Sequence, residues 1–184
     1  MNPLDEAWNW YLEARRVLRL TQRLGKKHWD DLPTDCGVFR DDDFKEIKGV
    51  DLAESARITL MPIDDFAIIK LFSAFECSVR ERVRSDVESE RKKITHPALE
   101  FAAEEALSNI RRGSFAKVLQ SLKKLDPSLV EEVRQVRGYR NWVSHGKNLS
   151  GSEKIPIVDP KAAYVRLHRF LMALEKQAFG DETE

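Results

Sequence analysis

The sequence predicts an all-α protein, an up-and-down bundle of four main helices with one or two shorter ones. Three observations carry this prediction. Apolar residues recur at three- and four-residue spacing along most of the chain. Capping residues, prolines and glycines bracket these stretches. Only residues 56–61 have the composition of a strand, and the chain has neither an internal repeat nor a low-complexity tract.

The first helix is expected to begin at Pro3, because proline is tolerated in a first helical turn, and to stop at Gly25. Residues 29–63 then break every helical period, so they are expected to form a long irregular insertion. Residues 56–61 predict at most one strand of a small hairpin there. Irregular segments of this length are often functional or cover part of a core.

The strongest helical pattern runs from Asp64 to about Lys93. A third helix is expected at 99–112, where its final basic residues suit the negative end of the helix dipole. Its successor is a short helix from Ser114 to Leu122. The apolar stripe of the 64–93 helix consists of Ile68, Phe72, Phe75, Val79 and Val83.

Two further helices complete the expected bundle. Ser128 and Glu131 have the spacing of a capping box, so a helix is expected to start at Ser128 and to end near Gly146. Asp159 followed by Pro160 predicts the start of the last helix, which ends near Gly180.

Composition limits the classes of protein to consider. The 184 residues carry 31 basic and 31 acidic side chains, and this length suits one domain spanning residues 1–184. Cys36 and Cys77 form no metal-binding or disulfide pattern. With neither a membrane-spanning segment nor a signal peptide, a reduced, cytoplasmic protein is expected. Zero net charge excludes binding to nucleic acid by bulk attraction, but it leaves room for a local basic site.

One helix carries a polar residue where its pattern requires an apolar one. The stripe on the 128–146 helix runs through 129, 133, 136, 140 and 143, and position 140 is an arginine. Because residues three and four apart are neighbours on a helix, a polar strip forms around it. Such a strip can bind a phosphodiester through guanidinium groups and move a proton through an imidazole. Its members are Arg137, Arg140, Asn141, Ser144 and His145.

Arg140-Asn-Trp-Val-Ser-His145 resembles the R-x(4–6)-H motif of the HEPN superfamily, small all-α proteins many of which are metal-independent ribonucleases. Arg23–His28 and Arg91–His96 match the same pattern. Context separates them, because the first contains the expected helix stop at Gly25. The second ends before Pro97, which disfavours helical geometry at His96. Only the third match lies within a capped amphipathic helix.

The resemblance covers residues 64–178. Phe75-Glu76 followed by Arg80 is similar to an aromatic-Glu-x-x-x-Arg pattern of that family, although Glu76 and Arg80 also suit a simple surface ion pair. Alternatively, Glu76 orients Arg140 or His145. Lys147 stands where family members silenced by a nucleotidyltransferase often carry a tyrosine, so that form of regulation is not expected.

The resemblance implies an endoribonuclease of the toxin or phage-defence type, active as a homodimer and needing neither metal nor cofactor. Arg140 and His145 would be catalytic, supported by Asn141, Ser144 and Glu76, and RNA would be attacked by its own 2′-hydroxyl. Arg80, Arg137 and Lys147 are the expected RNA contacts. A neighbouring-gene antitoxin is a possible partner.

Two alternatives stay open. The same cleft could hold RNA or a nucleotide without cleaving it, as in a sensor module. The polar strip could also be only the seam of a dimer.

Overall fold

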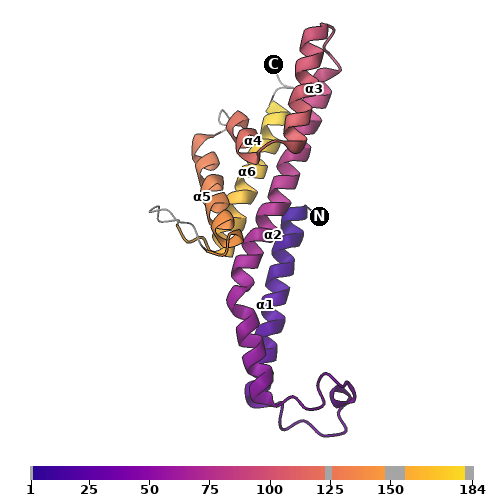
Figure 1. The fold of residues 1–184 in the computed structure, drawn as a ribbon, viewed down its shortest axis with the longest axis vertical. Helices are drawn as coiled ribbons and strands as arrows, with labels where there is room; N and C mark the ends of the chain where they lie inside the picture. Colours follow the sequence, from indigo (N-terminus) through magenta and orange to yellow (C-terminus); the bar gives the residue numbers. More distant parts are fainter. Residues whose placement is uncertain (1, 123–125, 148–155, 181–184) are drawn as a thin grey trace. The chain divides into compact units, whose positions relative to one another are not determined.

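The computed structural model describes residues 2–122, 126–147 and 156–180, and these residues are all helical or irregular, with no strand among them (Figure 1). The all-α prediction is therefore confirmed. The helices are α1 (Pro3–Lys27), the 3-10 helix η1 (Gly37–Arg40), α2 (Gly49–Arg91), α3 (Pro97–Arg112), α4 (Phe115–Ser121), α5 (Pro127–Ser144) and α6 (Pro160–Gly180).

The chain divides into two compact units. Residues Trp8–Ala67 form one of them, called here the hairpin unit. The other, called here the helical body, comprises residues up to Ala7 and residues from Ile68 onward. No helix in the described part of the chain is both long and apolar enough to span a membrane.

In the hairpin unit, α1 packs antiparallel against the first part of α2. Tyr11 of α1 is buried with Ile63 and Ala67 of α2, and Trp8 and Leu18 pack against this cluster. The Tyr11 hydroxyl donates to Oδ1 of Asp64 at 2.8 Å. Burial and this hydrogen bond to a carboxylate raise the pKa of Tyr11 to about 12.

The predicted insertion is wrong in its second half, because α2 begins at Gly49 rather than near Asp64 and residues 56–61 are helical, not a strand. Pro62 lies inside the helix, although an internal proline removes a hydrogen bond and costs about 3 kcal/mol. Burial compensates for it: Ala53, Ala56 and Ile63 are all at most 6% exposed. Packing against a neighbouring helix, which local sequence does not reveal, outweighs the breaker.

Gly25 does not stop the first helix, because α1 continues to Lys27. Its role is close packing. A Cβ at Gly25 would lie 2.6 Å from the carbonyl oxygen of Gly49 and 2.7 Å from the amide nitrogen of Ala53. Backbone therefore meets backbone where the two helices of the hairpin converge.

Residues 29–48 are irregular, as predicted, but they are anchored. The Trp29 indole is 5% exposed and donates to the carbonyl oxygen of Ile47 at 2.8 Å. The rings of Phe39 and Phe44 meet it edge-on. Asp30 accepts the backbone N–H of Gly49 at 2.9 Å, so this segment also fixes the start of α2.

Four phenylalanine rings centre the helical body. Phe75 of α2 lies 5.9 Å from Phe115 of α4 and 5.5 Å from Phe170 of α6, both edge-on, and Phe72 joins the same cluster. All four are at most 5% exposed. This core holds α4 and α6 against the second part of α2.

The caps of the body follow the sequence with one exception. Ser114 caps α4 and Asp159 caps α6, as predicted. The predicted cap at Ser128 is wrong: α5 starts at Pro127, and Asp126 accepts the N–H groups of Ser128 and Leu129. Asp-Pro here serves as N-cap and first helical residue, as at the start of α6.

Candidate functional site

The candidate site lies on the last turns of α5. This helix buries one face, formed by Leu129, Val130, Val133, Val136 and Tyr139. It packs against α6, where Arg166 donates to Gln135 at 3.2 Å and Arg169 lies 3.3 Å from Glu132. The predicted stripe is therefore apolar up to position 136, and beyond it the polar residues begin.

The helix ends in a Schellman motif, which fixes the backbone around His145. The N–H of Gly146 bonds the carbonyl of Val143 at 3.0 Å, and that of Lys147 bonds the carbonyl of Trp142 at 2.8 Å. Gly146 adopts a left-handed φ of 67°, which glycine tolerates without strain. His145 is consequently the C-cap of α5, and its side chain is exposed.

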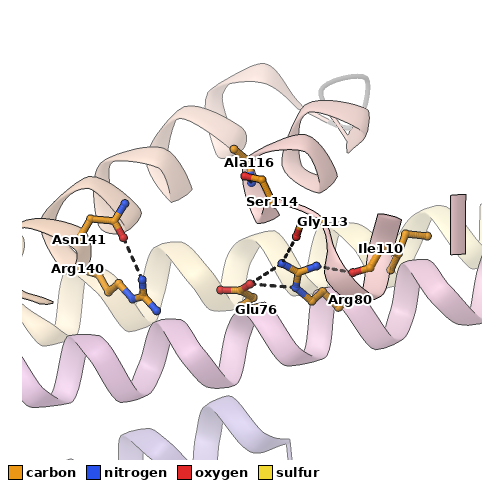
Figure 2. Close-up of polar contacts among 8 residues, drawn as sticks. All are labelled: Glu76, Arg80, Ile110, Gly113, Ser114, Ala116, Arg140 and Asn141. Atoms are coloured by element: carbon orange, nitrogen blue, oxygen red, sulfur yellow. Dashed lines mark hydrogen bonds and ion pairs between the residues drawn. The ribbon is translucent and has the colours of Figure 1, made fainter. Parts of the chain in front are cut away.

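Arg140 lies partly buried where α5 faces α2 (Figure 2). Its Nη1 donates to Oδ1 of Asn141 at 3.0 Å, and its guanidinium carbon lies 5.7 Å from the centre of the Phe72 ring. Its Nε is buried without an acceptor among the described residues. Within those residues the guanidinium has no carboxylate partner, although a partly desolvated charge is costly without one.

Glu76 and Arg80 form a different arrangement on α2, also drawn in Figure 2. Arg80 Nη2 lies 2.7 Å from Glu76 Oε1 and 3.0 Å from the carbonyl oxygen of Gly113, while Nη1 bonds the carbonyl oxygen of Ile110. The guanidinium also lies over the Phe115 ring. Both side chains thus bind protein groups at the end of α3, and Glu76 orients Arg80, not Arg140 or His145.

The structure brings together only some of the predicted residues. Arg140 and Asn141 are in contact, and the N–H of His145 bonds the carbonyl oxygen of Asn141 at 3.0 Å. Ser144 is exposed and Arg137 is half-buried. The ammonium of Lys147 lies over the Trp142 ring at 5.5 Å. Arg140 and His145 are five positions apart, so they project about 140° apart around the helix.

The two other matches to the motif pattern differ from expectation in one case. His96 is extended, with φ −89° and ψ 123°, and caps α3, as Pro97 predicts. Arg23–His28, however, is not interrupted by a helix stop, because α1 continues through Gly25. Arg23 is exposed, whereas Arg140 is half-buried, and this burial rather than helical context separates the two matches.

Sequence reasoning missed the groups that hold the two arginines. Phe72 and Phe115 were visible only as stripe residues, and the carbonyls of Ile110 and Gly113 have no side-chain signature. Within the described residues, no three His, Cys, Asp or Glu side chains cluster as ligands for a metal ion.

Comparison with protein-family models, curated proteins and solved structures finds no match to this chain. The HEPN resemblance therefore rests on the motif residues and stays a prediction.

Proposed function

We propose that this chain is a metal-independent endoribonuclease in which Arg140 binds the scissile phosphate and His145 transfers a proton. One observation carries the proposal: the Arg140 guanidinium is half-buried, and the described residues give it an amide but no carboxylate. An arginine held in this way is suited to an anion from outside the fold, and its fork matches phosphate oxygens.

The chemistry follows from the side chains at the end of α5 together with the resemblance of Arg140–His145 to the HEPN motif. The RNA 2′-oxygen attacks the adjacent phosphorus, the bond to the 5′-oxygen breaks, and the products are a 2′,3′-cyclic phosphate and a 5′-hydroxyl. His145 takes the 2′-hydroxyl proton or supplies one to the leaving 5′-oxygen. Arg140, positioned by Asn141, stabilises the charge that develops on the phosphoryl oxygens.

A second copy of the chain belongs to this proposal. Because Arg140 and His145 project about 140° apart, one α5 alone directs them to different sides of the helix. Pairing of two α5 helices, as the HEPN resemblance implies, would let Arg140 of one copy and His145 of the other face one phosphate. Ser144, exposed on the same turn as Arg140, would then contact the substrate or the imidazole.

RNA cleavage in the presence of EDTA tests the proposal. His145→Ala is expected to slow cleavage at least about 100-fold, the usual contribution of a proton-transfer group. Wild-type products should carry cyclic-phosphate ends. His28→Ala is the matched control, since His28 is an exposed histidine that follows a helix end in the same pattern. Equal cleavage by wild type and His145→Ala would refute the assignment.

One observation favours a second candidate function, an RNA- or nucleotide-binding module without catalysis. Arg140 faces the fold beside Phe72, whereas His145 is exposed at the helix end, so phosphate binding does not require the histidine. This function predicts that wild type binds RNA and leaves no cyclic-phosphate ends. Arg140→Ala would weaken binding, and His145→Ala would leave it unchanged.

The toxin or phage-defence setting is a further part of the proposal. Expression of wild type in bacterial cells is then expected to arrest growth, and His145→Ala to remove the arrest. An antitoxin encoded by a neighbouring gene would restore growth to cells expressing wild type.

A further inference from the structure

The second half of α1 has a basic character that the proposed site does not use. Between residues 14 and 29 the chain has six basic side chains and no acidic one. Helical spacing of three and four places Arg16, Arg19, Arg23 and Lys27 along one face. All four are exposed. The segment from 30 to 51, by contrast, is predominantly acidic.

Intramolecular pairing does not account for this face. Arg15 is committed to the hairpin, where it donates to the Tyr11 hydroxyl at 2.6 Å. Arg16 lies 3.7 Å from Glu13, and both side chains are more than two-thirds exposed. Arg19 and Arg23 have no hydrogen bond or ion pair with any residue that the structure describes. Two guanidinium groups on neighbouring turns are thus available to an external anion.

These arginines line a shallow groove rather than a flat surface. Its volume is about 540 Å³, and its walls are Leu12, Arg15, Arg16, Arg19, Leu20 and Arg23. Leu20 is 65% exposed and Leu12 44%. Apolar contact surface therefore lies between the cations, where the sugar or base of a nucleotide would fit between contacts to phosphates.

The layout of the charges selects an extended ligand. A site for one small anion has donors that converge on a point, whereas these cations are arranged in a line. From Arg16 to Lys27 the helix rises about 16 Å. Phosphates of a nucleic-acid strand follow one another every 3.4 Å or so along the axis, so this line faces several phosphates in succession.

We propose that this face of α1 binds the phosphate backbone of RNA. The inference rests on the proposed function, because it assigns a second contact surface to the same substrate. The arginines supply sequence-independent attraction, and Leu12 and Leu20 pack against the nucleoside. Binding at this face releases counterions, so it weakens as salt rises.

The test uses full-length protein carrying His145→Ala, so that the RNA stays intact, and a fluorescent 20-nucleotide single-stranded RNA. Arg19→Gln/Arg23→Gln removes the two unpaired charges of the groove. We expect the plot of log affinity against log salt to become shallower by about two, one for each lost phosphate contact. Arg19→Lys/Arg23→Lys keeps both charges and should retain most of the wild-type slope.

Lys45→Gln/Lys48→Gln is the matched control, because it removes two exposed charges from the same unit outside the groove. Its slope should equal that of the reference protein. An equal loss in the control and groove variants would overturn the inference, as would an unchanged slope in Arg19→Gln/Arg23→Gln. Binding to phosphatidylserine vesicles but not to RNA would overturn it too.

The inference and the proposed function can fail separately. If wild type cleaves RNA but the groove variant keeps its salt slope, the groove assignment is wrong and the proposed function stands. If wild type cleaves no RNA but the groove variant loses slope as expected, α1 is an RNA-binding surface and the catalytic assignment is wrong.

Discussion

Two arginines of the helical body have similar surroundings and opposite degrees of pairing. Arg80 and Arg140 are both half-buried, and the guanidinium of each lies over a phenylalanine ring. Arg80 also has Glu76 and two carbonyls of the α3 end, whereas Arg140 has Asn141 and a buried Nε without an acceptor among the described residues. Equal burial with unequal pairing distinguishes a structural arginine from a binding one.

The largest effect is expected when Arg80 is removed. Arg80→Ala leaves a carboxylate and two helix-end carbonyls without their donor, so the free energy of unfolding should fall by about 2 to 3 kcal/mol. Arg140→Ala removes no ion pair and should lower it by less than about 1 kcal/mol. Urea denaturation measures both.

Arg82→Ala supplies the control for Arg80, because Arg82 forms an exposed i, i+4 pair with Asp86 on the same helix. Its removal should change stability by only about 0.3 to 0.5 kcal/mol. If Arg140→Ala is as destabilising as Arg80→Ala, Arg140 is part of the fold and the distinction collapses.

Glu76→Gln gives an intermediate effect. Glutamine still accepts a hydrogen bond from Arg80, but the charge pair is lost, so we expect a loss of about 1 kcal/mol in the free energy of unfolding. Cleavage of RNA should be unchanged once the protein is folded, because Glu76 contacts Arg80 and not the α5 strip. A cleavage defect in folded Glu76→Gln would instead give Glu76 a role in the site.

Asn141→Ala tests how Arg140 is positioned. It removes one hydrogen bond with a net value of about 0.5 to 1.5 kcal/mol, so RNA affinity should fall about two- to tenfold. Thermal stability should be nearly unchanged. Gln135→Ala, which removes the partner of Arg166 on the same helix, should leave RNA affinity unaltered.

The smallest effect concerns pH and the start of α5. Hydrogen bonds from the hydroxyl and N–H of Ser128 lower the pKa of Asp126 below 3.8. A lowered pKa stabilises the fold above the unfolded-state value, and this contribution disappears as pH falls through the folded-state value. Wild type should therefore lose more stability than Asp126→Asn between about pH 6 and about pH 3. Parallel urea curves for the two proteins would contradict this.

How far sequence predicts this structure depends on where the deciding interaction lies. Asp159-Pro160 and Gly146 were recognisable because capping is settled within a few residues. Pro62 and Gly25 were misread as breaks, since the packing that makes them helical comes from a helix distant in sequence. Arg140 stood out because an apolar stripe predicted its burial, but its lack of a carboxylate partner is a tertiary property.

The acceptors of Arg80 have a consequence for how the body assembles. They lie 30 and 33 residues away, whereas the hydrogen bond between Asp5 and Tyr164 joins residues 159 apart. Closing a longer loop costs more chain entropy, so we expect the α2–α3 contact to form early during folding. The start of α1 then waits for α6, which is among the last segments to leave the ribosome.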